Sequence, residues 1–405
     1  MKITLLHYSA PPIVGGVESI LAAHARLLAG DGHSVQVIAG RGEQFHPDVE
    51  FLSIPLVDSN HADVLAVKKG LDAGLVPAQF EELKRAILQV LTPALQASRV
   101  LIVHNVCSLN KNLALTAALK EIASQTGSPR LILWHHDLAW TTPRYRSELH
   151  NGYPWNLLST DWPGAVQVVV SHERRRELAE LLAVSPERIH IVPNGIDIPT
   201  FLALDQLTCH LAEQSGAMRA DPLFLLPVRI TRRKNIELAV RIMDALRHEF
   251  SNPVLIVTGP PGPHNTSNYE YFSSLKTLRA DLGLKGQVHF LADYDAHLPD
   301  NVIHEFYRLA DALLLPSREE GFGIPVLEAG VARLPVFCTD IPPLVELGGE
   351  QVVTFSPGES PSRVAAIIGT TLKANPAYIL SSRVKREYNW GVIYREKIAP
   401  LLEAG

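Results

Sequence analysis

The sequence predicts an α/β protein built from two doubly wound domains, each with a parallel sheet covered by helices on both faces. Short runs of apolar, β-prone residues alternate with longer helical patterns along the chain. Strands that are apolar on both sides are typical of parallel sheets buried between two helix layers. In addition, 405 residues are too many for one ordinary core, so two domains are expected.

The first series of elements occupies the N-terminal half of the chain. The expected strands are Ile3–His7, Ser34–Ala39, Val100–His104, Leu131–Trp134, Val166–Val170 and Ile189–Val192. The expected helices include Val17–Ala29, Phe80–Gln96, Leu113–Ser124 and Glu173–Leu182. Regular alternation of strand and helix indicates a Rossmann-like domain.

The alternation stops around Pro193–Ala220, where a Pro-Asn-Gly turn is followed by a stretch without a clear period. A second series then has expected strands at Leu223–Pro227, Val254–Thr258, Val288–Leu291, Ala312–Leu315, Val336–Cys338 and Val352–Phe355. We therefore predict a first domain at residues 1–200 and a second at 201–387. A final amphipathic helix within 388–405 either completes the first domain or ends the second. Ligands are expected at the carboxyl ends of the strands, in a cleft between the domains.

Composition excludes several classes of protein. A formal net charge of −5 and a pI near 6.4 do not indicate a nucleic-acid partner. The N-terminal apolar run is too short for a signal peptide, and no window approaches 18 uninterrupted apolar residues. The three cysteines form neither a metal motif nor an even disulfide framework. We expect a cytoplasmic protein, and a peripheral contact with the inner face of a membrane stays open.

The densest motif is Pro316–Gly330, which follows an expected strand and opens a helix. Gly321 and Gly323 allow a tight turn and a close approach of the backbone to a ligand. A helix start offers free N–H groups and the positive end of the dipole, which suits a diphosphate. Glu320 is expected in the loop before the helix and Glu328 about one turn inside it. The two carboxylates could bind hydroxyls on either side of that diphosphate, or could merely complement the helix dipole.

Glu320 and Glu328, with seven residues between them in EGFGIPVLE, resemble the EX7E signature of glycosyltransferase family 4. The members of this family are retaining enzymes of the GT-B fold. The resemblance extends over nearly the whole chain, because further motifs occur in the family's order. These are the glycine turn Gly15-Gly16-Val17-Glu18, the step His136-Asp137, the segment Val192–Asp197 that closes the first domain, and the cations Arg229 and Lys234.

The resemblance implies a role for each motif. Glu320 would contact hydroxyls of the transferred sugar, and Glu328 would bind the ribose of the nucleotide. Arg229 and Lys234 would neutralise the diphosphate and the charge that develops on it as it leaves. The family's usual Gly-Arg and Lys-Gly pairs are here Val228-Arg229 and Lys234-Asn235, but both cations are kept. The full donor-binding set is Gly15, Gly16, Arg229, Lys234, Glu320, Gly321, Phe322, Gly323, Ile324, Leu327 and Glu328.

His136 would touch the donor sugar, which completes a catalytic set with Glu320, Arg229 and Lys234. His135 is the neighbouring alternative for the same contact. The acceptor-side candidates are His104, Asn105, Asp137 and Asn194.

Other interpretations stay open at several of these motifs. The glycine turn could serve folding only, and the Arg-Arg-Lys run could be a solvated basic patch. Arg232 and Arg233 leave the pairing of cation and phosphate undecided. Residues 43–75 and 139–163 are the expected acceptor walls, but their aromatic and arginine side chains could simply anchor a long loop. The Pro/Gly loop Gly259–Asn268 is either a donor contact or a connector.

These roles imply a retaining glycosyltransferase that moves a hexose from a nucleotide sugar to a hydroxyl of a carbohydrate or glycoconjugate. GDP-mannose and UDP-glucose are slightly favoured as donors. No residue is identifiable as a carboxylate nucleophile, so front-face transfer is expected. We expect no cofactor and no metal, because Asp293-Tyr294-Asp295 resembles a DxD metal motif only superficially. The alternatives are a non-catalytic nucleotide-sugar binding protein and a nucleotide-sugar epimerase on the same fold.

Overall fold

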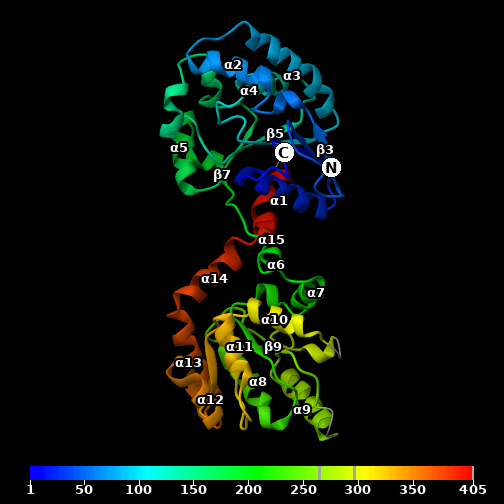
Figure 1. Cartoon of the computed structure of the whole chain (residues 1–405), viewed down its shortest axis with the longest axis vertical. Helices are drawn as coiled ribbons and strands as arrows, with labels where there is room; N and C mark the ends of the chain where they lie inside the picture. The colour runs from blue at the N-terminus through cyan, green and yellow to red at the C-terminus, as the bar shows by residue number, and fades with distance from the viewer. Residues whose placement is uncertain (263–265, 295–297, 404–405) are drawn as a thin grey trace. The chain divides into compact units, whose positions relative to one another are not determined.

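The structure is a computed structural model that describes residues 1–262, 266–294 and 298–403. The chain divides into two compact units (Figure 1). Unit 1 comprises Met1–Gly195 with Trp390–Gly405, and unit 2 comprises Ile196–Asn389. The boundaries predicted from the sequence lie at residues 200 and 388. No helix within the described ranges is long and apolar enough to cross a membrane.

Unit 1 contains a seven-stranded parallel sheet with the order β3-β2-β1-β4-β5-β6-β7. Its strands are β1 (Lys2–Leu6), β2 (Ser34–Ala39), β3 (Val49–Ser53), β4 (Val100–His104), β5 (Arg130–His135), β6 (Val166–Val169) and β7 (Ile189–Ile191). Leu5 of β1 lies opposite Val37 of β2 and Ile102 of β4. Leu5 and Leu6 belong to different buried clusters, because successive side chains point to opposite faces of the sheet. Both faces are therefore covered, as the apolar runs predict.

The helices of unit 1 form the two covering layers. One buried cluster joins the sheet to α2 (Ala62–Asp72), α3 (Gln79–Leu95) and α4 (Leu113–Ala123). The other joins it to α1 (Gly16–Gly30), and α5 (His172–Leu182) follows β6.

The edge strand β3 was not predicted from the sequence. Only Val49 of this strand is buried, whereas Glu50 and Ser53 are exposed. A strand at the edge of a sheet has one neighbour, so it needs less apolar surface than an inner strand and its pattern is weaker. The segment 43–75, predicted as a loop, therefore contains a strand and the helix α2.

The C-terminal segment belongs to unit 1. It is helical from α15 (Trp390–Ile393) through a π-helical turn at Tyr394–Ile398 to α16 (Ala399–Glu403). Its apolar side chains join the buried cluster of α1, and the red α15 lies beside the blue α1 in Figure 1. Arg130 Nη1 donates a hydrogen bond of 2.7 Å to the Leu401 carbonyl. A Cβ at Gly195 would lie 2.6 Å from Cδ2 of Trp390, so this glycine allows the segment to pack closely.

Unit 2 contains a six-stranded parallel sheet with the order β10-β9-β8-β11-β12-β13. Its strands are β8 (Leu223–Leu226), β9 (Val254–Val257), β10 (Val288–Phe290), β11 (Ala312–Leu315), β12 (Val336–Thr339) and β13 (Val353–Phe355). Its helices are α6 (Ile198–Phe201), α7 (Gln206–Gln214), α8 (Ile236–Leu246), α9 (Ser267–Asp281), α10 (Asp300–Leu309), α11 (Ile324–Ala332), α12 (Pro342–Gly348), α13 (Pro361–Lys373) and α14 (Pro376–Glu387).

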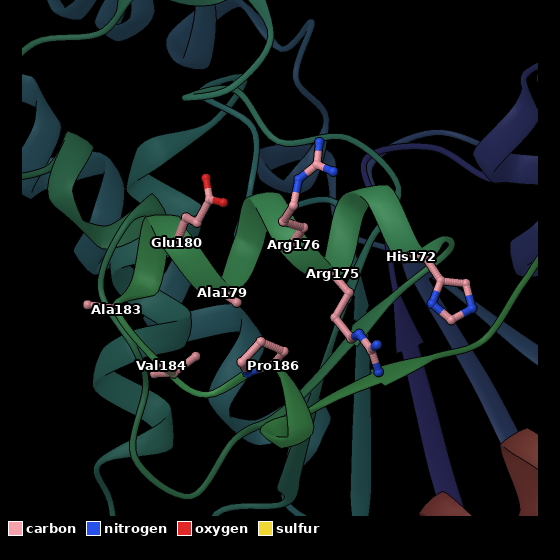
Figure 2. Close-up of a pocket in the computed structure, with 8 residues that line it drawn as sticks. All are labelled: His172, Arg175, Arg176, Ala179, Glu180, Ala183, Val184 and Pro186. Atoms are coloured by element: carbon pink, nitrogen blue, oxygen red, sulfur yellow. The ribbon is translucent and has the colours of Figure 1, made fainter.

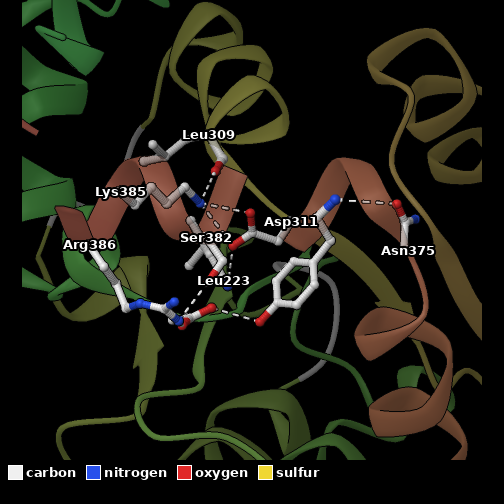
Figure 3. A network of polar contacts seen from close by, with 9 residues as sticks. Leu223, Leu309, Asp311, Asn375, Ser382, Lys385 and Arg386 are labelled. Carbon is white, nitrogen blue, oxygen red and sulfur yellow. Dashed lines mark hydrogen bonds and ion pairs between the residues drawn. The ribbon is translucent and has the colours of Figure 1, made fainter. Parts of the chain in front are cut away.

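A polar network fixes α14 to the start of the unit 2 sheet (Figure 3). Lys385 Nζ lies 2.8 Å from both carboxylate oxygens of Asp311, which also accepts the backbone N–H of Leu223. The neighbouring Asp221 accepts hydrogen bonds from the Tyr378 hydroxyl and the Arg386 guanidinium, both at 2.7 Å.

Both sheets reverse their strand order beside their first strand, between β1 and β4 in unit 1 and between β8 and β11 in unit 2. Open parallel sheets bind ligands at the carboxyl ends of the strands beside such a reversal. The predicted fold class, two doubly wound parallel domains, is confirmed. The loops after these four strands are therefore the candidate ligand sites.

Candidate active site

The loops after β8 and β11 of unit 2 are joined by a buried ion pair. Lys234 Nζ lies 2.6 and 2.7 Å from the two carboxylate oxygens of Glu320. The two side chains are only 9% and 6% exposed. The backbone N–H of Arg318 donates to the Arg233 carbonyl at 2.8 Å, which ties the two loops together. Two residues 86 positions apart in the sequence therefore form one charged pair.

The Glu320 carboxylate is also fixed from its own loop. Ser317 Oγ donates a hydrogen bond of 2.7 Å to Glu320 Oε1. The Ser317 carbonyl in turn accepts a hydrogen bond of 2.5 Å from Thr339 Oγ1 on β12. Burial lowers the pKa of Lys234 below its ordinary value of 10.5, and the hydrogen bonds to Glu320 oppose that shift. Ser317 is a site residue that the sequence analysis did not identify.

The other cations of this loop differ from Lys234. Arg233 is half exposed, and its Nη1 lies 3.7 Å from Glu320 Oε2. The Arg232 guanidinium lies over the Tyr271 ring, 5.1 Å from its centroid. Arg229 is exposed and has no hydrogen bond or ion pair to any residue that the structure describes. Of the predicted phosphate-binding pair, Lys234 thus contacts Glu320, and Arg229 has a free guanidinium.

The helix α11 begins directly after the glycine-rich turn. Gly323 has a φ of 104°, and a Cβ there would lie 2.7 Å from Leu344 Cδ2, so glycine is required at this position. Phe322 and Ile324 are 56% and 58% exposed at the helix start, and Leu327 is 46% exposed one turn later. Glu328 lies on α11, where its Oε2 accepts a hydrogen bond of 2.6 Å from the Tyr307 hydroxyl.

The glycine turn of unit 1 holds a carboxylate. Gly15 caps α1, and a Cβ there would lie 2.0 Å from Oε2 of Glu18. Ser9 Oγ donates a hydrogen bond of 2.6 Å to Oε1 of Glu18. A Cβ at Gly16 would meet no atom of the described residues within 4 Å. The turn therefore presents a negative charge beside the free N–H groups of the helix start. Glu18 stands in the recognised glycine motif, but the sequence analysis gave it no role.

The predicted histidines lie where β4 and β5 end. His104 Nδ1 and His136 Nε2 are 3.1 Å apart, and Asn105 Oδ1 accepts the backbone N–H groups of His136 and Asp137 at 2.7 and 3.2 Å. Asn105 therefore organises the turn that carries His136. By contrast, His135 is inside β5, where its Nε2 lies 2.8 Å from Gln167 Oε1. Of the two neighbours, His136 is the one at the carboxyl edge.

Burial keeps these histidines neutral at pH 7. It lowers the pKa of His136 to about 3 and that of His7, after β1, to about 4. It also lowers the pKa of His104 well below 6.5. The Glu18 carboxylate, 3.9 Å from His7 Nε2, opposes the shift at His7 without reversing it. Neutral imidazoles can each donate one hydrogen bond and accept another, which suits hydroxyl groups.

The remaining predicted residues differ in their exposure to solvent. Asn194 is exposed, and Asp137 is half buried. In the segment 139–163, Trp155 and Trp162 are 3% and 2% exposed within the unit 1 core, so these two anchor the loop. Tyr153 is 45% exposed.

The residues that resemble a DxD motif fall partly outside the described ranges. Asp293 forms ion pairs of 3.5 Å with Lys276 and Arg279, whereas Asp295 lies outside the described residues. Residues 263–265 of the predicted Pro/Gly loop also lie outside them. Within the described part of the chain, no group of three or more acidic, histidine or cysteine side chains could hold a metal ion.

A cavity of about 430 Å³ lies along α5 of unit 1. In Figure 2, Arg176 and Glu180 project from one side of this helix and Arg175 from another. The lining residues are His172, Arg175, Arg176, Ala179, Glu180, Ala183, Val184 and Pro186. None of the predicted site residues lines this cavity.

Comparison with known sequences decides the family. The model described as "Glycosyltransferase Family 4" matches residues 14–199, and the model "Glycosyl transferases group 1" matches residues 211–384. The chain belongs to glycosyltransferase family 4. It is a glycosyltransferase of the GT-B type, as the resemblance of its motifs implies.

The curated relatives are distant. A mannosylglucosylglycerate synthase from Thermotoga maritima is 23% identical over 83% of this chain and 80% of its own length. A D-inositol 3-phosphate glycosyltransferase from Nocardia farcinica is 30% identical over 42% of this chain and 36% of its own. The serotype-specific mannosyltransferase WbdA of Escherichia coli is 27% identical over 46% of this chain and 22% of its own. This glycosyltransferase thus matches less than half the length of the last two.

Matches among solved structures include WaaG, a glycosyltransferase involved in lipopolysaccharide biosynthesis, and Anabaena HepE in complex with UDP and glucose. WaaG is 18% identical with a TM-score of 0.37, and the match covers 100% of both chains. HepE is 19% identical, also with a TM-score of 0.37 and coverage of 100% of both chains.

Proposed function

We propose that this glycosyltransferase is a retaining hexosyltransferase that uses a nucleotide sugar and needs no metal ion. The observation that carries the proposal is the buried Lys234–Glu320 pair between the loops after β8 and β11. These loops flank the reversal of strand order in unit 2, where such folds bind ligands. The pair holds a sugar-binding carboxylate and a phosphate-binding cation in one place.

The surroundings of the pair suit a nucleoside diphosphate. An ammonium group has three N–H donors. Lys234 directs two of them at the two oxygens of Glu320, so the third remains for a phosphate oxygen. Arg229 supplies a second cation that has no partner among the described residues, and the start of α11 supplies the positive end of a helix dipole. The exposed side chains of Phe322 and Ile324 provide an apolar surface beside them.

Transfer would then proceed on one face of the sugar. The bond between the anomeric carbon and the diphosphate oxygen breaks, and the acceptor oxygen forms its bond to the same carbon. The leaving diphosphate oxygen takes the proton of the acceptor hydroxyl. Arg229 and Lys234 stabilise the charge that develops on the diphosphate, which a divalent cation would otherwise have to do.

The chemistry of unit 1 supports a hydroxyl-bearing acceptor. The Glu18 carboxylate in the glycine turn disfavours a phosphate at that helix start and can accept a hydrogen bond from a hydroxyl. The neutral imidazole of His136 can accept or donate a hydrogen bond, which suits its predicted contact with a hydroxyl of the donor sugar. Among donors, GDP-mannose is tested first, since WbdA is named a mannosyltransferase and the Thermotoga relative a mannosylglucosylglycerate synthase. UDP-glucose is tested next.

The test is nucleotide release by the purified chain against a panel of GDP-, UDP- and ADP-sugars, each with and without EDTA. We expect turnover of one donor that is unaffected by EDTA. Glu320→Ala should lower the rate by roughly a hundred- to thousand-fold, because it removes the contact to the transferred sugar. Near-normal turnover in this variant would refute the site. NMR of the product's anomeric proton tests retention, and an inverted product would refute front-face transfer.

A further inference from the structure

Tyr307 of α10 contacts a carboxylate that sequence resemblance assigns to the nucleotide. Its hydroxyl donates a hydrogen bond of 2.6 Å to Oε2 of Glu328 on α11. The side chain is 3% exposed and belongs to the hydrophobic core of unit 2. Because its ring is packed on all sides, Tyr307 cannot easily move away from this partner. The contact therefore holds one oxygen of Glu328 in a fixed position.

The second oxygen of Glu328 is left available. Glu328 is half buried, and its Oε1 has no hydrogen-bond partner among the residues that the structure describes. A carboxylate can rotate about its terminal bond, which has only a shallow rotational preference. A fixed donor on one oxygen stops that rotation and aims the other oxygen. Burial raises the pKa of Tyr307 well above 10, so the phenol stays a donor at every pH at which the enzyme works.

We propose that Tyr307 is a positioning residue for recognition of the sugar of the nucleotide: by holding Oε2 of Glu328, it presents Oε1 to the ribose hydroxyls and so lets the enzyme distinguish a ribonucleotide from its deoxy counterpart. This inference rests on the proposed function, because it requires a nucleoside diphosphate at the start of α11. The inference adds to that function that the discrimination between a ribonucleotide and its deoxy form depends on Tyr307, a residue outside the EX7E motif.

The experiment is calorimetric titration of the full chain with GDP, UDP and ADP and with the 2′,3′-dideoxy form of each. The wild type should bind one ribonucleotide at least about tenfold more tightly than its dideoxy form, since a hydrogen bond to a charged group is involved. Tyr307→Phe removes only the hydroxyl. It should weaken binding of the ribonucleotide by roughly tenfold and leave the dideoxy form unchanged, so that the discrimination disappears.

A matched control is present in the same unit. Tyr378 is also buried, and its hydroxyl also donates to a carboxylate, Asp221 Oδ1, at 2.7 Å. Tyr378→Phe removes the same chemical group from the same kind of pair, but this pair anchors α14 rather than α11. It should leave the discrimination intact. Thermal melts report whether each variant is folded.

A second variant keeps the inference testable should Tyr307→Phe fold poorly. Glu328→Gln retains the shape of the side chain but not its charge, and should by itself abolish the discrimination. In this background Tyr307→Phe should change nucleotide binding little, since the two residues act through one contact. Independent, additive losses from the two changes would contradict a positioning role.

The outcomes separate the two proposals. Discrimination that survives in Tyr307→Phe, or that is lost equally in Tyr378→Phe, would overturn the role of Tyr307. Nucleotide binding without any preference for ribose in the wild type would overturn the inference but leave the proposed function standing. Absence of binding to all three diphosphates would overturn both.

Discussion

In unit 1, neutral histidines lie at the carboxyl ends of β1, β4 and β5, whereas in unit 2 charged partners follow β8 and β11. The two sheets have the same parallel, doubly wound topology. Yet His7, His104 and His136 are buried and uncharged, while Lys234 and Glu320 are buried and paired. The difference lies entirely in the side chains that the loops carry.

One fold can therefore serve two kinds of ligand. A buried ion pair keeps its charge and so can exchange one partner for a phosphate. A buried imidazole avoids the cost of desolvating a charge by giving up its proton. Unit 2 is therefore suited to an anionic group and unit 1 to neutral hydroxyls.

The largest effect should follow from removing the charged partner in unit 2. Lys234→Met leaves Glu320 buried without its cation and removes a phosphate contact, so kcat/KM should fall by roughly a hundred- to thousand-fold. The control is Arg233→Met, because Arg233 is half exposed and 3.7 Å from the same carboxylate. Its loss should be below about fivefold. Steady-state kinetics with the identified donor measure both, and equal losses would show that the buried pair has no special role.

A buried pair away from the site should affect stability instead. Lys385→Met leaves Asp311 without a cation in the network of α14, where the two side chains are 10% and 4% exposed. Unit 2 should lose about 3 kcal/mol of unfolding free energy. Arg383→Met on the same helix removes an exposed pair with Glu387, which solvent screens, and should cost far less. Urea denaturation distinguishes them, and a similar cost for both would contradict the role of burial.

The neutral histidines of unit 1 predict a loss of stability in acid. Burial lowers the pKa of His24 on α1 to about 3, below its ordinary 6.5, so the unfolded chain binds a proton that the folded chain does not. The contribution of His24 to the unfolding free energy is therefore fully present above about pH 6.5. It falls by about 1.4 kcal/mol per pH unit as the pH drops from there toward 3.

His24→Leu should flatten that dependence. Neither ring nitrogen of His24 has a hydrogen-bond partner among the residues that the structure describes, and the ring packs against Trp134 and Trp390. Leucine should therefore be tolerated near pH 7 and be the more stable residue at pH 5, by roughly 2 kcal/mol. Denaturation curves at both pH values measure the gain. The exposed His190 of unit 1, changed to Leu, is the control, and an equal effect there would contradict burial as the cause.

Much of this molecule could be predicted from its sequence because local patterns decide local structure. Apolar runs located the inner strands of both sheets, and the glycine-rich turn before α11 located the start of that helix. The edge strand β3 was missed because its apolar pattern is weak. The motif residues could be recognised one by one, but not their partners.

Tertiary structure alone decided which of these residues meet. Lys234 and Glu320 are brought together only because β8 and β11 are neighbours in the sheet, and Tyr307 reaches Glu328 only because α10 packs beside α11. In the same way, packing turned Trp155 and Trp162 into core residues and left the imidazoles of His104 and His136 neutral. Spacing along a chain sets the period of a helix or strand. It does not set the distance between segments that are far apart in the sequence, or the dielectric environment around their side chains. That distance decides which side chains make contact, and that environment decides which groups are charged.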